Sequence, residues 1–237
     1  MNKLLIDNNI DNNDIFVDSD QDLEIVFNDT ERVLNIHIAK GCRVRGFIRT
    51  KNTKNTIRYI LDDDTSVEIN KLSIDCSDNV TIELNDINSN IKYNTSVINY
   101  LDNSYTQKIV HNKSDTRSKI VNHCINVDNN EFVFKVDGII ARNSSSVKFN
   151  QDNKIINLRD GKSNILPNLI VDDCDVEASH SAYIGTFDEN AKFYMMSRGL
   201  TSNECDDLLI KAFLLNDMKL DEHEREVFSS IIETINK

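Results

Sequence analysis

Glycine, proline and tryptophan are scarce in this chain, which contains six Gly, one Pro and no Trp among 237 residues. Few of its turns can therefore depend on glycine. Asparagine and aspartate are abundant instead, and their short side chains tolerate the left-handed backbone region and hydrogen-bond the local main chain. We expect these two residue types to form most of the turns, which suits a fold of many short strands.

Long apolar runs and a surplus of positive charge are missing as well. No stretch of about 18 apolar residues is present, and the apolar stretch near the start is too short for a signal peptide. A formal net charge of −12 opposes attraction to nucleic acid and to anionic membranes. The composition predicts a soluble, cytoplasmic protein with neither nucleic acid nor a membrane as a partner.

The cysteines form no C-x-x-C pair and lie far apart, which predicts neither a disulfide framework nor a closed zinc site. They are Cys42, Cys76, Cys124, Cys174 and Cys205. The phosphate-binding pattern G-x-x-x-x-G-K-[ST] is also absent, so ATP hydrolysis is not expected of this chain.

Apolar residues alternate with polar ones in short segments from about residue 23 to residue 186. The segments V-L-N-I-H-I (33–38), N-V-T-I-E-L-N (79–85) and F-V-F-K-V-D-G-I-I (132–140) show the two-residue period of strands. Asn/Asp/Ser-rich breaks separate them, and residues 1–22 are expected to be a polar lead-in. This pattern predicts an all-β core over 23–186, and a sandwich, a barrel and a solenoid all agree with it.

Helical patterns replace the strands over residues 187–237. The segment F-D-E-N-A-K-F-Y-M-M-S-R-G-L (187–200) predicts a short helix that ends at Gly199, a left-handed cap. Thr201 with Glu204 forms a T-x-x-E capping box before a second helix. A third begins at Asp221, and the apolar faces of the last two helices are predicted at Leu208, Leu209, Ala212 and Phe213 and at Val227, Phe228, Ile231, Ile232 and Ile235.

One ordered set of motifs carries a resemblance to a known family. Residues 160–214 contain a proline before an aliphatic strand, an acidic turn with D-V, the segment S-H-S-A, the pair I-G, and then F-Y-M-M-S-R-G. This order resembles the end of the SufB/SufD family, the scaffold subunits of the Suf iron–sulfur cluster assembly machine. The S-H-S-A segment is closer to S-H-G-A-T of SufD-like members than to E-H-E-A-T of SufB-like members. The resemblance covers roughly residues 110–215 and, more loosely, 30–110.

The resemblance implies a right-handed parallel β-helix followed by C-terminal helices. It implies a noncatalytic scaffold subunit that pairs through its β-helix with a SufB-like subunit or a second copy and docks a SufC-type ABC ATPase. A transient iron–sulfur cluster or iron at the subunit interface is the expected cargo, and no stably bound cofactor is expected. His180 stands at the position of the family's cluster-site histidine.

Three residues are candidate metal ligands on this basis. His180 offers an imidazole nitrogen, which suits iron, and Cys174 offers a thiolate six residues earlier. Glu177 could add an oxygen ligand or orient the imidazole ring. The alternatives are a histidine satisfied by neighbouring backbone groups, a solvated glutamate and a cysteine without a metal role.

Candidate partner-binding residues lie in the helical region, where Arg198, Leu208, Leu209, Ala212 and Phe213 are predicted to contact the ATPase. The aromatic and methionine side chains of F-Y-M-M-S-R-G are expected instead to seal the last β coil. Two other functions fit the sequence less directly. One is a structural paralogue without metal chemistry, and the other is a β-helical enzyme acting on polysaccharide, which the acidic charge disfavours.

Overall fold

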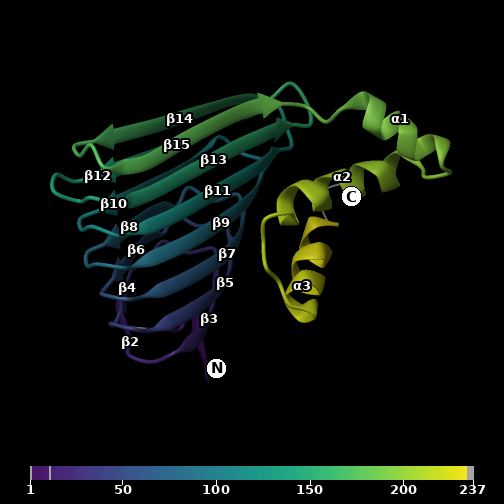
Figure 1. Cartoon of the computed structure of the whole chain (residues 1–237). Helices are drawn as coiled ribbons and strands as arrows, with labels where there is room; N and C mark the ends of the chain where they lie inside the picture. Colours follow the sequence, from purple (N-terminus) through teal and green to yellow (C-terminus); the bar gives the residue numbers. More distant parts are fainter. Residues whose placement is uncertain (1, 11, 234–237) are drawn as a thin grey trace.

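The computed structural model describes residues 2–10 and 12–233, which form fifteen strands and three helices (Figure 1). The odd-numbered strands form one sheet: β1 Asn2–Asp7, β3 Gln21–Asn28, β5 Arg43–Lys51, β7 Ser66–Ile74, β9 Asn90–Asn99, β11 Arg117–Asn126, β13 Val147–Asn157 and β15 Val176–Gly185. The even-numbered strands form the other: β2 Asp14–Val17, β4 Val33–Ile38, β6 Thr56–Leu61, β8 Asn79–Leu84, β10 Asn103–His111, β12 Glu131–Ile140 and β14 Lys162–Val171.

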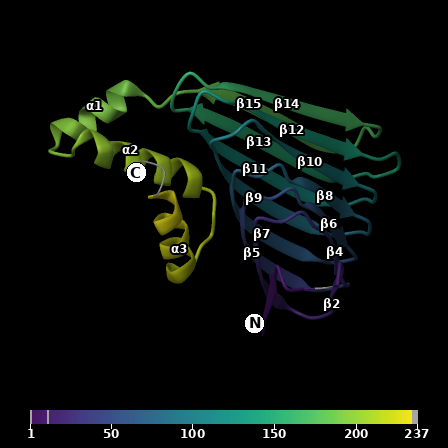
Figure 2. The ribbon, with the colours of Figure 1, turned by 180° about the vertical axis from the view of Figure 1, so that it is seen from behind.

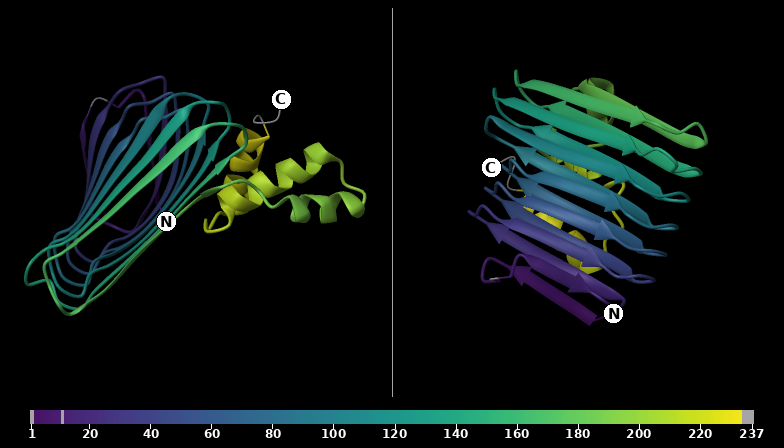
Figure 3. Two further views of the ribbon diagram at one scale, coloured as in Figure 1. Left: turned by 90° about the horizontal axis from the view of Figure 1, so that it is seen from above. Right: turned by 90° about the vertical axis from the view of Figure 1, so that its left-hand side faces the viewer.

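The chain winds from one sheet to the other at every strand, and each strand pairs in parallel with the equivalent strand of the next coil. Each coil therefore contributes one strand to each sheet, and the two sheets enclose a flattened interior (Figures 1 and 3). The fold is a parallel β-helix, as the family resemblance implies. The parallel pairing excludes an antiparallel sandwich and an antiparallel barrel.

Apolar side chains at alternate positions of each strand point inward and fill the interior of the coils. On β13, for example, Val147, Phe149 and Ile155 are buried, whereas Lys148 and Asn150 between them are exposed. Side chains of equivalent positions stack along the axis in columns, so a coil buries its apolar row only when it has neighbours. The resulting core is continuous from Ile6 to Ile165.

Asparagine and aspartate occupy the sharp corners, which confirms the prediction from the scarcity of glycine. Within the described residues, seven of the eight non-glycine residues with positive φ are Asn or Asp. Side chains at equivalent corners of successive coils also form hydrogen bonds. The Asn52 side-chain amide donates to Asp29 at 2.8 Å, and the Asn88 side-chain amide donates to Asp64 at 3.1 Å. These corner contacts help to hold successive coils in register.

A buried ion pair interrupts the apolar interior. Lys71 Nζ lies 2.5 Å from Asp78 Oδ2, and both side chains are fully buried. Asp78 Oδ1 also accepts hydrogen bonds from Thr53 Oγ1 at 2.9 Å and from the Asn55 backbone amide at 2.8 Å. One carboxylate thus links three segments of neighbouring coils. Removing one partner of such a pair typically costs about 3–5 kcal/mol because the other charge remains buried.

The structure corrects the polar lead-in expected over residues 1–22. Strands β1 and β2 form there, and β3 begins at Gln21. The reason is that Ile6, Ile15 and Val17 point into the first coil and are buried, while the surrounding Asn and Asp residues form its turns. The lead-in is therefore the first coil of the stack.

Three helices follow the stack: α1 Glu189–Ser197, α2 Ser202–Leu215 and α3 Glu222–Ile232. The predicted capping box of Thr201 with Glu204 forms, and Asp221, the predicted start of the third helix, forms a second capping box with Glu224. Gly199 has a φ of +99°, as a left-handed residue after a helix requires. Viewed from above or from behind, the helices lie beside the stack and not over its end (Figures 2 and 3).

Helices α2 and α3 pack on the outer face of the odd-numbered sheet. A second apolar cluster joins Phe47, Ile98 and Ile125 of the sheet to Leu214 and Phe228 of the helices. Sheet side chains also donate hydrogen bonds to carbonyl groups at the end of α2 and just beyond it, from Ser96 to Leu214, from Lys92 to Asp217 and from Asn70 to Lys219. These donors satisfy groups that a helix end leaves unpaired.

Two helix predictions need correction. Helix α1 has no buried residue, so its aromatic and methionine side chains do not seal the last coil. Helix α2 buries Ile210 and Leu214 in place of the predicted Leu208, which is 48% exposed. On α3 the predicted Phe228 and Ile232 are buried, and Ile235 lies outside the described residues.

Candidate functional site

The last coil of the stack is open at its C-terminal end. Strand β15 pairs with β13 on one side, strand β14 pairs with β12, and neither has a second strand partner within the described residues. Apolar side chains are exposed on both strands: Leu166, Ile170, Val171, Tyr183 and Ile184. An unpaired strand edge with apolar neighbours is a surface on which another chain can add strands.

His180 lies in the middle of β15 at this open end. Its register partner on β13 is Gln151, which is fully buried and faces the interior of the coil. In-register neighbours of a parallel pair point to the same side, so His180 belongs to the inward-facing row. It is nevertheless exposed, because no further coil covers β15.

Gln151 lacks the hydrogen bonds that a buried amide normally makes. Neither its Nε2 nor its Oε1 has a hydrogen-bond partner in the described part of the chain. Leaving a buried polar group unpaired costs about 1–3 kcal/mol, so such groups call for a ligand, water or partner. Unpartnered polar atoms also occur deeper in the stack, for example at Asn55 and Tyr93, so it is the exposed imidazole beside a free strand edge that marks the open end as the candidate site.

The other two predicted ligands lie elsewhere. Glu177 is three residues before His180 on the same strand, so it faces outward, where its carboxylate pairs with Lys148 Nζ at 2.9 Å. Cys174 is exposed in the turn between β14 and β15, and its backbone amide is held by Asp173. The turn breaks the even spacing that would have placed Cys174 and His180 on one face.

This chain does not gather a metal site by itself. Within residues 2–10 and 12–233, no group of three or more His, Cys, Asp or Glu side chains is placed to hold a metal ion. His180 can therefore act as a ligand only if other donors come from a second subunit. A single imidazole at an open surface is suited to a shared site of this kind.

The predicted partner-binding residues divide between two surfaces. Leu208 and Ala212 of α2 are exposed, and Arg198 is exposed after α1, where its guanidinium lies 5.0 Å from the Tyr194 ring centre. Leu209 is half-buried. Phe213 instead faces the sheet and stacks on His123 with ring centres 4.6 Å apart.

Helix α1 offers the apolar surface that the sequence did not indicate. Phe193 is 75% exposed, and Tyr194 and Met196 are exposed beside it. The sequence holds no signal for this surface, because apolar residues at helical spacing look the same whether they face a core or solvent. Exposed apolar groups of this size on one short helix are typical of a protein-binding surface.

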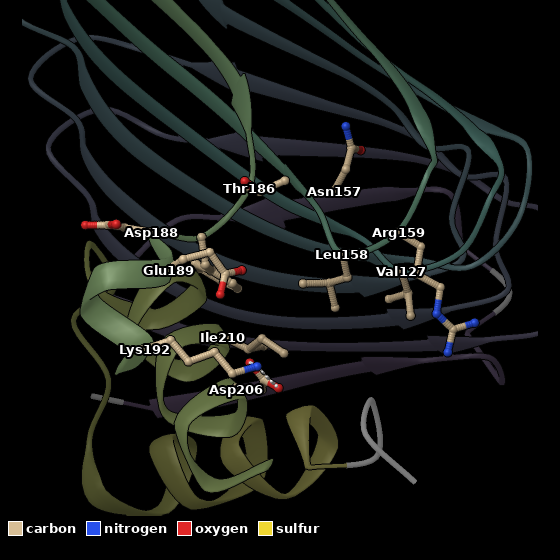
Figure 4. Close-up of a pocket in the computed structure, with 11 residues that line it drawn as sticks. Val127, Asn157, Leu158, Arg159, Thr186, Asp188, Glu189, Lys192, Asp206 and Ile210 are labelled. Carbon is tan, nitrogen blue, oxygen red and sulfur yellow. Dashed lines mark hydrogen bonds and ion pairs between the residues drawn. The ribbon is translucent and has the colours of Figure 1, made fainter. Parts of the chain in front are cut away.

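A cavity of about 470 Å³ separates α1 and α2 from the end of the stack. Figure 4 shows Lys192 beside Asp206, with their charged groups 2.7 Å apart, and Arg159 directed away from them. Arg159 pairs with Asp128 outside the cavity at 2.6 Å. The charges of the cavity are thus largely satisfied, and His180, Cys174 and Glu177 are not part of its lining.

Most of the other histidine and cysteine side chains of the β region are buried: His111, His123, Cys42, Cys76 and Cys124. His123 and Cys124 are adjacent on β11 and face opposite ways, so a nucleophile–base pair between them is excluded. Burial raises the pKa of the Cys124 thiol well above its ordinary value, which keeps it protonated and unreactive.

His111 is held as a neutral ring. Its Nδ1 lies 2.7 Å from Thr116 Oγ1, and its Nε2 lies 2.8 Å from Ser118 Oγ. The Thr116 hydroxyl already donates to the Lys113 carbonyl, so Nδ1–H donates to Thr116 and Nε2 accepts from Ser118. Burial lowers the pKa of His111 from 6.5 to about 4.

The fold defines the class of protein as a parallel β-helix with an open C-terminal end and a laterally attached helical subdomain. None of the helices within the described ranges is long and apolar enough to cross a membrane.

Comparison with known proteins identifies the family. The family described as "SUF system FeS cluster assembly, SufBD core domain" matches residues 28–213, most of the chain, and the chain belongs to it. It is also similar to the "Iron-sulfur cluster assembly protein SufD" of Bacillus subtilis (strain 168), with 26% identity over 132 residues. That match covers 54% of this chain and 30% of the Bacillus protein.

His111 makes folding stability depend on pH. Its pKa is lower in the folded state than in the unfolded chain, so its contribution is complete above pH 6.5 and is lost as the pH falls through about 4. The loss amounts to about 3 kcal/mol. We expect His111→Gln to flatten the dependence of the unfolding free energy on pH over this range, measured by urea denaturation. His223→Gln, at an exposed position, is the control, and equal slopes for both variants would contradict the assignment.

Proposed function

We propose that this chain is a noncatalytic, SufD-like scaffold subunit of a Suf iron–sulfur cluster assembly complex. Membership of the SufBD family and the similarity to the Bacillus SufD protein support the assembly role. The observation that carries the proposal is the open end of the stack, where His180 lies on β15, a strand with an unpaired edge within the described residues.

Pairing of subunits is proposed to occur through β14 and β15. Their free edges carry unpaired backbone groups, and exposed Leu166, Ile170 and Tyr183 lie on the same strands. A second SufB/SufD-like subunit, or a second copy of this chain, would satisfy the backbone groups and bury the apolar side chains together. The partner would then face His180 directly.

The cargo is proposed to be iron or a nascent iron–sulfur cluster held between the two subunits. His180 supplies one nitrogen, and the remaining ligands come from the facing subunit, because no complete set exists within the described residues of this chain. Cys174 lies at the same end of the stack and could join the site after a rearrangement of its turn. Glu177, paired with Lys148, acts at most by holding β15 to β13.

The ATPase is proposed to bind to the helices. The exposed face of α1 with Phe193, Tyr194 and Met196, together with Leu208 and Ala212 of α2, forms the apolar surface available there. A SufC-type ATPase supplies nucleotide hydrolysis that this chain lacks the sequence motif to perform. The attachment of α2 and α3 to the sheet would transmit movement of the ATPase to the stack.

One observation favours a second candidate function. The three predicted ligands are not brought together in this chain. A structural paralogue that completes the subunit pair without contributing to the metal site would show the same arrangement, and a substitution at His180 separates the two functions.

Binding of the ATPase is tested by Phe193→Glu. A charge placed in the centre of the apolar face of α1 is expected to reduce the ATPase recovered with the tagged chain by about tenfold or more. The measurement is co-purification after co-expression of the complete complex. Phe16→Glu, at a 71% exposed phenylalanine on β2 far from the helices, is the matched control. Equal recovery with both variants would contradict docking on α1.

Cluster assembly is tested by His180→Ala in the purified complex. The His180 ring makes no hydrogen bond within the described residues, so the variant should keep its fold and its partners while the visible absorbance of reconstituted cluster falls severalfold. His37→Ala, on β4 at the other end of the stack, should assemble normal amounts. Full cluster assembly by the His180 variant would support the structural paralogue instead.

A further inference from the structure

The outer face of the odd-numbered sheet is only half covered by helices. The covered part comprises the later positions of β5 to β13, whereas the first positions of β9, β11, β13 and β15 remain open. They line a groove of about 750 Å³, formed by Asn90, Lys92, Arg117, Lys119, Lys148 and Glu177 with neighbouring backbone.

The groove is basic although the chain as a whole has a net charge of −12. We use the name basic groove for the surface formed by Lys92, Arg117, Lys119 and Lys148. Among the described residues of the lining, Glu177 is the one carboxylate. Positive charge concentrated in one groove of an acidic protein creates a local potential opposite to that of the rest of the surface.

The cations of the groove are only partly neutralised. Lys148 pairs with Glu177, and Lys92 lies 3.4 Å from Glu68 and donates to the Asp217 carbonyl at 3.0 Å. Lys119 is 4.0 Å from Asp217, at the limit of an ion pair. The Arg117 guanidinium has no hydrogen bond or ion pair in the part of the chain that the structure describes.

The cations form a regular grid. Lys92 and Lys119 are register partners on β9 and β11, and Arg117 and Lys148 are register partners on β11 and β13. Neighbouring strands lie about 4.8 Å apart, and alternate residues of one strand lie about 6.6 Å apart. An extended peptide with an acidic residue at every second position spaces its carboxylates by a similar distance and can meet several cations at once.

We propose that the basic groove docks an extended segment of a partner protein rich in aspartate or glutamate. Nucleic acid fits less well, since the one aromatic residue in the described lining, Phe149, is 1% exposed and offers no face on which a base could stack. The net charge of −12 also repels a long polyanion, whereas a short acidic segment contacts only the basic groove. The inference does not require a metal at His180.

The test uses the full chain and a fluorescein-labelled octapeptide of alternating aspartate and serine, with binding measured by fluorescence anisotropy at low salt. Arg117→Glu with Lys119→Glu is expected to weaken binding by about tenfold or more, because each reversal replaces an attraction by a repulsion. Lys108→Glu with Lys135→Glu is the matched control. Both of its lysines are exposed on strands of the other sheet, and the change in net charge is the same.

A third variant is designed to increase binding. Glu177→Gln removes the carboxylate that competes for Lys148, and it is expected to tighten binding of the peptide about twofold to threefold. Circular dichroism would reveal whether the double variant Arg117→Glu with Lys119→Glu fails to fold. In that case the Glu177→Gln variant still tests the proposal.

Three outcomes would overturn the proposal. The first is equal weakening by the two double variants, which would mean that only total charge matters. The second is no tightening by Glu177→Gln. The third is binding of single-stranded DNA as strong as that of the peptide and with the same dependence on Arg117 and Lys119, which would assign the groove to another class of ligand.

Discussion

Hydrogen bonding between parallel strands is the constraint on which the rest of this structure depends. Each strand inside the stack is satisfied by the coil before it and the coil after it, so the β-helix is complete everywhere except at its two ends. At the C-terminal end the helices that follow the stack do not cover the free edges, because α2 and α3 turn aside and pack on the outer face of the odd-numbered sheet. The open end therefore follows directly from the way the helical subdomain is attached.

Polar groups enter the interior of the stack without destabilising it wherever each finds a partner. Lys71 and Asp78 are paired, and the Asn122 side-chain amide donates to Gln107 on β10, across the interior, and to Asn153 on β13, in the next coil. Pairing is not complete throughout the interior, since both amide atoms of Gln151, beside His180, and of Asn55, deeper in the stack, lack a hydrogen-bond partner within the described residues. Gln151 differs from Asn55 in its position, because the strand next to it, β15, has a free edge.

Much of the architecture could be predicted from local patterns. Two-residue alternation predicted the strands, the scarcity of glycine predicted Asn and Asp at the left-handed corners, and capping boxes at Thr201 and Asp221 predicted two helix starts. Local patterns do not show which surface a helix packs against. The predicted buried face of α2 therefore differs from the observed one by one or two residues. They also hid the first coil, because isolated Ile6, Ile15 and Val17 among Asn and Asp do not form a long alternating run. Of the three predicted ligands, His180 lies in the inward-facing row at the open end, and its role as a ligand stays a prediction. Strand alternation separates Glu177 from His180, and the Lys71–Asp78 pair and the orphaned Gln151 depend on contacts between coils that one sequence does not reveal.

The central claim is that the free edge of β15 is completed by a second subunit. Hydrogen exchange of individual backbone amides, compared between the isolated chain and its complex with the paired scaffold subunit, tests it most directly. The backbone amides of β15 that point toward its free edge are expected to exchange rapidly in the isolated chain and to become protected in the complex. The amides on the free edges of β1 and β2 are expected to exchange at the same rate in both. Unchanged exchange in β15, or new protection confined to β1 and β2, would contradict the claim.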